Sequence, residues 1–366
     1  MERSRSSIKW RFQQKGLHVT VTIKEVAQRA GVSIQTVSNV LHDYAFIRPE
    51  LRKKVQDVIE ELHYQPNYSA RYLRTKRAGV LALAIPDLSN DYFSDIGYAV
   101  IETAVAQSYE VLIEHTGGSW DHELSLIKGL RPHLIDGAIL SPLALSIEDL
   151  QQAHQHGLLL VLIGERFQDN LDLPYDHIVV NNVAAARVAV EHLIGLGRRQ
   201  IVALGDQQTP PNIREMAQFR RQGYEEALRA AGLPLDPQLI IQTPSGHSRS
   251  SGYQALQTLL ETGQRFDAVF CFNDLTAFGA LRALHQAGYR VPEDVAVIGF
   301  DNLEEGAYST PSLTTIAPDK QEIGRIATAF LIGRILGTRT ASPEQVEVPF
   351  HLKIRESTMG AFANNE

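Results

Sequence analysis

The chain has 366 residues, a single cysteine and a formal net charge of −7, and 44% of its residues are hydrophobic. This length allows two or three domains with their own cores. The one cysteine, Cys271, excludes a disulfide framework and a cysteine-rich zinc site. No apolar run approaches the roughly 18 residues that span a bilayer, and the basic residues 1–16 have no apolar stretch behind them, which argues against a secretory signal.

The charge is divided unevenly along the chain. Residues 1–77 carry 15 Lys and Arg against 7 Asp and Glu, a net charge of +8, whereas the other 289 residues carry −15. A basic head on an acidic body indicates that only the head meets a polyanion. The charge alone equally fits a solvated basic tail. Residues 1–20 are expected to be a basic extension, for which disorder is one expectation. They are either a mis-assigned start or an arm that reaches a minor groove.

Residues 21–66 are expected to form a small all-α domain with a helix-turn-helix. Thr22 and Glu25 have the spacing of a capping box, which predicts a helix from residue 23. Gly31 can take the left-handed conformation that ends a helix, and Ser33 is placed to cap a second helix. A third helix is predicted from Pro49, and its apolar stripe is Leu51, Val55, Ile59 and Leu62.

The second helix is expected to offer a polar face to a major groove. Its side chains that can reach base edges or phosphates are Gln35, Thr36, Ser38 and Asn39, and Ile34 can touch a thymine methyl. The plainer alternative is a helical hairpin with a polar face turned to water.

From residue 78 onward, apolar runs alternate with helical patterns. One series of buried strands is predicted at residues 80–85, 111–113, 137–140 and 158–163, and a second at 178–180, 201–204, 239–241, 268–270 and 295–298. Helices are predicted near residues 98–106, 122–130, 183–195, 214–231, 249–261 and 275–287. This alternation is typical of doubly wound α/β sheets, and the two series predict two similar subdomains.

Ligands on such sheets bind beyond the carboxyl ends of the strands. The loops at those ends span residues 86–93, 115–120, 141, 164–166, 206–214, 272–274 and 300–302. They contain carboxylates, amides and aromatic rings, a mixture that suits a small polyhydroxylated molecule. Asn273 and Asp274 also precede a predicted helix and could simply cap it.

The sequence lacks the motifs of the common α/β enzymes. It has no G-x-G-x-x-G, P-loop, G-x-S-x-G or H-E-x-x-H pattern, and its 13 histidines show no metal-ligand spacing. We therefore expect no catalytic residues, no metal and no cofactor. A binding protein without a DNA-binding role is a second alternative, against which the basic head argues.

Residues 21–41 and 62–74 closely resemble the lactose-repressor (LacI/GalR) family of bacterial regulators, and the resemblance continues to Arg355-Glu-Ser-Thr358. It implies a hinge at residues 67–77 that becomes helical on operator DNA and wedges Leu73 into a base step. It also implies DNA contacts from Thr22, Ser33, Asn67 and Arg71. The effector contacts that it implies are Tyr92, Phe93, Arg220, Asn273 and Asp301, with Glu165 beside a position that is often aspartate in the family.

The resemblance implies a transcriptional regulator, most simply a repressor, that reads palindromic operator DNA as a homodimer. A small-molecule effector, expected to be a sugar or sugar derivative, would bind between the subdomains of a core at residues 78–360. The expected N-subdomain spans about 78–176 plus 315–340, and the C-subdomain about 177–312 plus 345–358. Asn39 and His42 depart from the family's usual Arg and Asn, which affects operator sequence. We expect a cytoplasmic protein, without a membrane partner, that associates with the nucleoid when bound to DNA.

Overall fold

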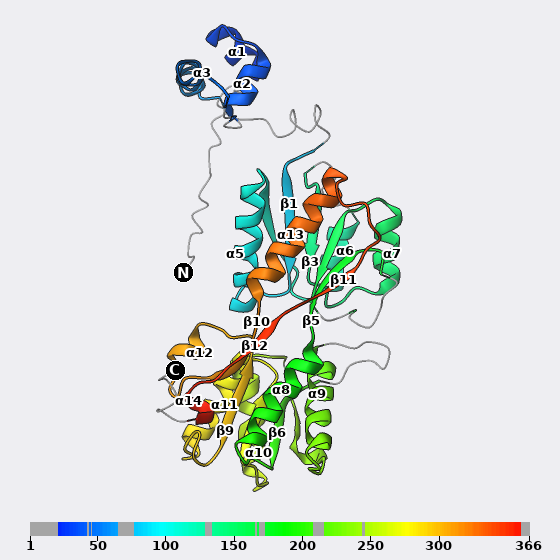
Figure 1. Cartoon of the computed structure of the whole chain (residues 1–366), viewed down its shortest axis with the longest axis vertical. Coiled ribbons are helices and arrows are strands. Elements are labelled where there is room, and N and C mark those ends of the chain that lie inside the picture. The colour runs from blue at the N-terminus through cyan, green and yellow to red at the C-terminus, as the bar shows by residue number, and fades with distance from the viewer. Residues whose placement is uncertain are drawn as a thin grey trace, which may run out of the picture. The chain divides into compact units, whose positions relative to one another are not determined.

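The computed structural model describes residues 21–41, 44, 46–64, 77–128, 134–164, 167, 173–207, 216–243 and 246–359. The chain divides into two compact units, a head within residues 1–78 and a core within residues 79–366 (Figure 1). The expected basic extension at 1–20 and the hinge residues Asn67, Arg71 and Leu73 lie outside the described residues. No helix in the described ranges is long and apolar enough to cross a membrane.

Within its described residues, the head contains the three helices α1 (Ile23–Ala30), α2 (Ile34–Leu41) and α3 (Pro49–Glu61). The predicted capping box is present, because the Thr22 hydroxyl accepts from the Glu25 amide and the Glu25 carboxylate accepts from the Thr22 amide. Gly31 ends α1 at φ 64°, as expected of a left-handed cap. The core of the head joins Val26, Ala27, Ala30, Val37, Val40, Val55 and Val58. Val58, which the predicted stripe omitted, is buried in this core.

The first sheet of the core has the strand order β11-β5-β4-β3-β1-β2, with every pair parallel. Its strands are β1 (Val80–Ile85), β2 (Glu110–His115), β3 (Gly137–Leu140), β4 (Leu160–Ile163), β5 (Asp176–Val180) and β11 (Gln345–Val348). Helices α5 (Asp91–Ala106) and α13 (Lys320–Leu336) pack on one face. Helices α6 (Trp120–Ile127) and α7 (Ile147–Gln155) cover the other.

The second sheet has the order β12-β10-β9-β8-β6-β7, and only the β10–β12 pair is antiparallel. Its strands are β6 (Ile201–Asp206), β7 (Ile240–Gln242), β8 (Ala268–Cys271), β9 (Ala296–Phe300), β10 (Thr314–Pro318) and β12 (Phe350–Lys353). Helices α8 (Asn182–Gly195) and α9 (Met216–Ala230) pack on one face, and α10 (Arg249–Glu261) and α11 (Asp274–Gln286) on the other. The short elements α12 (Glu305–Tyr308), α14 (Glu356–Met359) and a 3₁₀ turn (Pro237–Leu239) complete it.

Three strands lie in the opposite sheet from the one expected. β5, predicted to open the second series, pairs with β4 in the first sheet. β10 pairs with β9 in the second sheet, although residues 315–340 were assigned to the N-subdomain, and only α13 lies there. β11 pairs with β5 in the first sheet, although residues 345–358 were assigned to the C-subdomain. The chain therefore crosses between the sheets three times, after β5, after β10 and after β11 (Figure 1).

Strand β2 also differs from its predicted burial. Among the described strands it pairs only with β1, so it is an edge strand, and Ile113 remains 39% exposed. An edge strand is covered on fewer sides than a central one, which accounts for the difference. The sequence pattern of apolar residues had suggested a fully buried strand.

Candidate functional site

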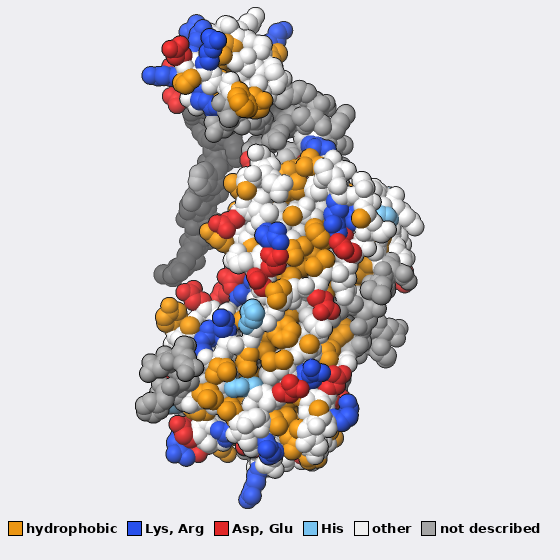
Figure 2. Space-filling model, viewed as in Figure 1, with side chains coloured by type: hydrophobic (Ala, Val, Ile, Leu, Met, Phe, Trp, Pro, Cys, Tyr) orange, Lys and Arg blue, Asp and Glu red, His pale blue; other side chains and the backbone are white. Residues whose placement is uncertain are grey.

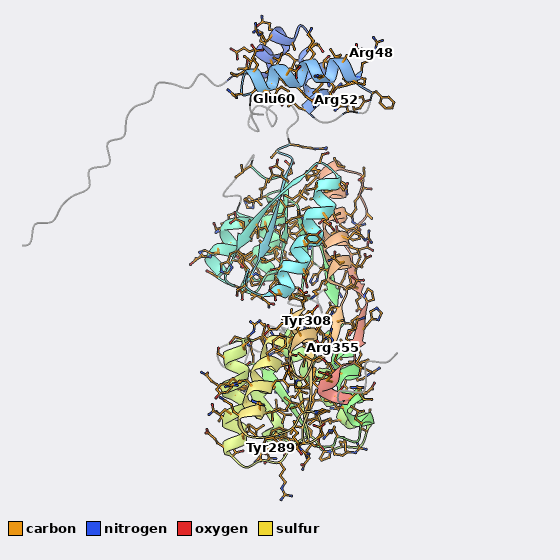
Figure 3. The ribbon with its side chains drawn as sticks, turned by 90° about the vertical axis from the view of Figure 1, so that its left-hand side faces the viewer. Arg48, Arg52, Glu60, Tyr289, Tyr308 and Arg355 are labelled. Atoms are coloured by element: carbon orange, nitrogen blue, oxygen red, sulfur yellow. The ribbon has the colours of Figure 1, made fainter. Side chains whose placement is uncertain are left out.

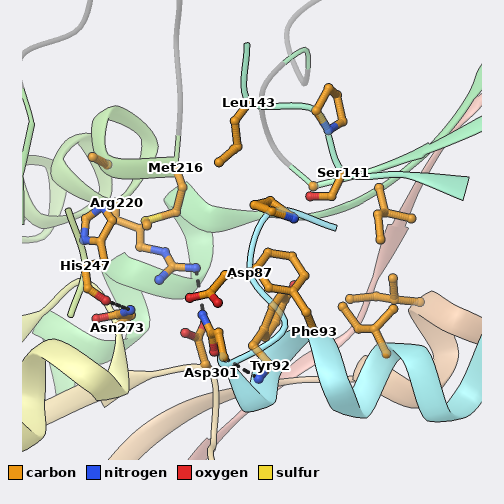
Figure 4. Close-up of a pocket in the computed structure, with 18 of the residues that line it drawn as sticks. Asp87, Tyr92, Phe93, Ser141, Leu143, Met216, Arg220, His247, Asn273 and Asp301 are labelled. Atoms are coloured by element: carbon orange, nitrogen blue, oxygen red, sulfur yellow. Dashed lines mark hydrogen bonds and ion pairs between the residues drawn. The ribbon is translucent and has the colours of Figure 1, made fainter. Parts of the chain in front are cut away.

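A cavity of about 310 Å³ lies between the two sheets of the core, where the carboxyl ends of strands from both sheets converge (Figure 4). This volume lies within the range of small-molecule sites, roughly 300–1,000 Å³. The loop after β1, the loop after β3 and the end of β4 form the wall from the first sheet. The wall from the second sheet comes from β6, α9, the segment after β7 and the ends of β8 and β9.

Arg220 of α9 is the one cation among the described residues that line this cavity. Its Nε donates to Asn182 Oδ1 at 2.7 Å, and its Nη1 donates to the carbonyl of Phe272. The guanidinium lies over the ring of Phe300, 3.3 Å from the ring centroid. These contacts hold a buried cation in one orientation, with its remaining edge toward Asp301 at 3.6 Å (Figure 4).

Asp301 occupies an unusual backbone conformation at the end of β9. Its φ is 112° and that of Asn302 is 48°, and residues other than glycine rarely adopt such positive φ angles. Such strain persists only where the surroundings hold it, and it gathers at ligand sites. Here Asp301 N–H donates to the Ile316 carbonyl at 2.9 Å, and Leu303 N–H donates to Asp274 Oδ2 at 2.8 Å. The turn thus presents the Asp301 carboxylate to the cavity.

Asp274 supports this turn from behind and does not line the cavity. Its carboxyl is fully buried and accepts from Thr315 Oγ1 at 2.6 Å. Burial, together with the nearby Asp301 charge, raises the pKa of Asp274 to about 8. Since Asp274 begins α11 and accepts from Leu303, which follows β9, and from Thr315 within β10, it fixes the turn after β9 against β10.

Asn273 both caps helix α11 and lines the cavity, so its roles as a helix cap and as a cavity residue do not exclude each other. Its Oδ1 accepts from Thr276 N–H at 2.9 Å, and its Nδ2 donates to the His247 carbonyl at 3.1 Å. His247 itself lines the cavity, and its Nδ1 has no hydrogen-bond partner among the described residues. Burial lowers the pKa of His247 to about 4, and the nearby Arg220 charge adds to this. A neutral imidazole at this position can exchange a hydrogen bond with a bound molecule.

Two aromatic rings face the polar groups from the first sheet. Asn90 caps α5 through the Tyr92 amide, and this places Tyr92 and Phe93 in the first turn of the helix. Their rings meet edge to face, with centroids 5.2 Å apart. Leu143 and Met216 add apolar surface (Figure 4). Carboxylates that accept from hydroxyl groups, beside aromatic faces, suit a polyhydroxylated ring.

A buried carboxylate shapes one wall of the cavity without lining it. Glu123 of α6 accepts hydrogen bonds from three successive amides, those of Leu143, Ala144 and Leu145, at 2.8 to 3.0 Å. That arrangement fixes the loop after β3, which contributes Ser141 and Leu143 to the cavity.

The structure brings five of the six residues expected to contact an effector to one cavity: Tyr92, Phe93, Arg220, Asn273 and Asp301. Glu165 lies outside the described residues, although its neighbour Gly164 lines the cavity. The expected loop at residues 115–120 does not contribute to the lining. The sequence interpretation missed His247, which follows the carboxyl end of β7. The strand-end rule would have found it had it been applied to the predicted strand at residues 239–241.

The second helix of the head presents part of the predicted polar face. Ile34 and Gln35 are exposed, Thr36 and Asn39 are half-buried, and Gln35 Nε2 donates to Asn39 Oδ1 at 2.9 Å. Ser33 and Thr22 are exposed at the amino ends of α2 and α1. Lys and Arg side chains also lie on the surface of the head (Figure 2), among them Arg48, which precedes α3, and Arg52 within it (Figure 3).

Ser38 does not lie on the exposed face expected of it. Its side chain is buried, with 5% exposure. It precedes Leu41 by three positions, a spacing that places two residues on one side of a helix, and Leu41 packs against the core of the head. We therefore remove Ser38 from the residues available to contact bases.

Comparison with known proteins gives two family matches. Residues 22–67 match the lacI family of bacterial regulatory proteins, and residues 190–358 match a periplasmic binding protein-like domain. The chain is similar to the ribose operon repressor of Halalkalibacterium halodurans, with 31% identity over 340 residues, which cover 93% of this chain and 97% of the repressor.

Solved structures show the same likeness. A putative transcriptional regulator of the LacI family from Sanguibacter keddieii has 41% identity and a TM-score of 0.70, and the match covers 78% of this chain and all of that one. The lac repressor dimer bound to operator and the anti-inducer ONPF has 26% identity and a TM-score of 0.75, and the match covers 92% of this chain and 99% of that one.

Proposed function

The chain belongs to the lacI family of bacterial regulatory proteins, and we propose that it is a repressor whose binding to a palindromic operator is controlled by a sugar. Members of this family are DNA-binding transcriptional regulators and not enzymes. The observation that carries the proposal is the coexistence, in one chain, of an exposed helix-turn-helix face and a polar cavity with aromatic walls. We assign its place of action to the cytoplasm, where operator DNA is found.

The head supplies the DNA contacts in this proposal. Ile34, Gln35, Thr36 and Asn39 of α2 read bases in the major groove, while Thr22 and Ser33 reach phosphates beside the helix ends. Residues 67–77, with Asn67, Arg71 and Leu73, serve as the hinge in the minor groove. Arg and Lys side chains on the head supply the sequence-independent attraction to phosphates.

The core cavity takes the effector. Asp301, Arg220 and Asn273 hold its hydroxyl groups, Tyr92 and Phe93 pack on its apolar face, and Glu165 adds a further contact. The ribose operon repressor supports a sugar by its name. Because residues from both sheets line the cavity, a bound sugar would contact both subdomains and favour one relative position of the two.

The homodimer in this proposal uses one side of the core. Tyr98, Ile101 and Val105 of α5 have the spacing of a single helical stripe and are 59%, 37% and 62% exposed. Tyr308 of α12 is 80% exposed and lies on the same side of the core as α5 (Figures 1 and 3). An exposed apolar stripe of this kind marks a protein interface, and we assign it to a second copy because the similar lac repressor structure is that of a dimer.

Selection from a random duplex library with the full-length protein tests the DNA-binding part. The proposal predicts enrichment of a two-fold palindrome whose half-sites are about one helical turn apart. Sedimentation of the protein on the selected duplex should give two chains per site. Enrichment of a single unpaired half-site, or of no sequence, would contradict the proposal.

A further inference from the structure

One lysine connects the two subdomains beside the turn that presents Asp301. Lys320, the first residue of α13, is 8% exposed. Its ammonium lies 2.5 Å from Asp95 Oδ2 on α5, and it donates to the Asn302 carbonyl at 3.0 Å. Asp95 belongs to the subdomain of the first sheet, whereas Asn302 follows β9 of the second sheet. A single side chain therefore bonds to both.

The first-subdomain side of this contact is rigid. Helix α13 packs closely along α5, because a Cβ at Gly324 would lie within 2.8 Å of the Ile96 carbonyl and 2.7 Å of the Ala99 Cβ. We therefore expect Lys320 and Asp95 to move together with α5. The same helix carries Tyr92 and Phe93 into the cavity and presents the apolar stripe of Tyr98, Ile101 and Val105 on its outer side.

The second-subdomain side is the strained turn that presents Asp301. Three contacts hold Asn302 within it: its amide donates to Thr315 Oγ1 at 3.3 Å, its Oδ1 accepts from Arg355 Nη2 at 2.8 Å, and its carbonyl accepts from Lys320. Asn302, whose carbonyl accepts from Lys320, directly follows Asp301, which lines the cavity. A shift of Asp301 by a bound molecule would thus move the acceptor of Lys320.

We propose that Lys320 is a latch between the subdomains, which joins the Asp301–Asn302 turn to α5 and so links the state of the cavity to the position of the helix that bears the apolar stripe. This inference rests on the proposed function for its biological purpose, but the latch itself is a property of the core alone. Lys320 is a positioning residue, since it lies outside the cavity lining.

The physical basis is the cost of an ammonium with few partners away from water. Among the described residues Lys320 has two oxygen partners, one in each subdomain. A change in their separation would leave the buried charge with only one of them. The carbonyl and the carboxylate together therefore favour the present arrangement over others. Removal of the charge should release that preference while the packing of α13 on α5 stays intact.

The test is a distance measurement between spin labels on the full-length protein, with Glu148→Cys on α7 and Glu261→Cys on α10 as labelling sites. Both positions are exposed, and the native Cys271 is fully buried, which keeps it out of the labelling reaction. Lys320→Met keeps an apolar stem without the charge, and Lys320→Arg restores a cation. Arg325→Gln is the matched control, because Arg325 pairs with Glu322 within α13 and not across the subdomains.

The labelled parent and Arg325→Gln should give the same narrow distance distribution. Lys320→Met should raise a second arrangement from a minor population, below about 10%, to a major one, and Lys320→Arg should reverse much of that change. Asp95→Asn should broaden the distribution in the same direction. Because Asp95 is the half-exposed partner in the contact, this variant replaces Lys320→Met in the test if Lys320→Met does not fold. A Lys320→Met or Asp95→Asn distribution that matches the parent would overturn the latch. Because neither DNA nor sugar is present, that result would leave the proposed function standing.

Discussion

Replacement of Asp301 by asparagine tests the ligand site with the least change of shape. The side chain is 9% exposed and faces the cavity on a strained turn. A hydrogen bond to a charged acceptor contributes roughly 1.5–3 kcal/mol, so the loss of the charge should weaken sugar binding by about 2 kcal/mol, or about 30-fold in Kd. Asparagine retains an acceptor oxygen, and the residual affinity should reflect it.

Thermal unfolding measures this effect without knowledge of the operator. A panel of mono- and disaccharides, ribose among them, is first tested on the wild-type protein. The best sugar at 100 times its Kd should stabilise the native state by about 2.7 kcal/mol, a rise in Tm of about 5 °C for a core of this size. After a 30-fold loss in affinity the same concentration should contribute only about 0.9 kcal/mol, or about 2 °C.

Each protein is compared with its own ligand-free Tm, because Asp301→Asn also removes the charge that faces Arg220 and shifts the baseline. Asp121→Asn is the matched control, since Asp121 is exposed in the first turn of α6 and does not line the cavity. It should keep the whole ligand-induced shift. A full shift in Asp301→Asn as well would show that Asp301 does not hold the sugar, and the reasoning about this cavity would fail.

Three further predictions follow from single contacts. Gln35→Ala should relax the base preference of the selected DNA site with little change in the salt dependence of binding; an unchanged preference in a repeated selection would remove Gln35 from the readout. Glu123→Gln should lower Tm by about 4 °C, because the new amide nitrogen would face one of the three backbone amides that donate to the carboxylate. This loss lowers the free energy of unfolding by about 2 kcal/mol, and an unchanged Tm in calorimetry would contradict it. For Asp274, burial raises the pKa to about 8 from an ordinary 3.8, so the folded state retains a proton that the unfolded state releases, and stability falls as pH rises toward 8. Between pH 6 and 8 urea unfolding should therefore show the wild type losing about 2 kcal/mol relative to Asp274→Asn, and parallel pH profiles would refute the assignment.

Much of the head could be predicted because its signals are local. The capping box at Thr22 and Glu25, the left-handed Gly31 and the proline that opens α3 each act within one helical turn. Ser38 was one exception beside Val58, since the burial of Ser38 depends on how α2 packs against the rest of the head. A pattern along one helix does not contain that information.

The exchange of strands between sheets could not be predicted, because a strand's apolar pattern is the same in either sheet. β5 is held in the first sheet by contacts from the far end of the chain. The buried Asp176 carboxylate accepts from Arg334 Nε at 2.8 Å and Arg339 Nη2 at 3.1 Å, and it also accepts from the Glu344 amide. These partners are more than 150 positions away. Nothing in the local sequence of β5 marks them.

The site was more predictable than the topology. Strand ends bring their loops to one edge in either sheet order, so Tyr92, Arg220, Asn273 and Asp301 meet in the cavity even though three strands had been misplaced. What the sequence did not reveal is the support behind these residues. The strain at Asp301, the carboxyl of Asp274 and the contact of Lys320 with Asp95 all arise from tertiary packing.

In the proposed function, one chain couples a ligand cavity in its core to DNA binding by its head. The direct test is a titration of the selected duplex with full-length protein, by fluorescence anisotropy, with and without saturating amounts of the sugar that gave the largest thermal shift. Coupling of about 1–3 kcal/mol, typical of allosteric proteins, predicts a change in apparent Kd of about 5- to 150-fold, and Asp301→Asn should need far more sugar to reach it. An apparent Kd that stays the same while the sugar demonstrably binds the core would contradict the account.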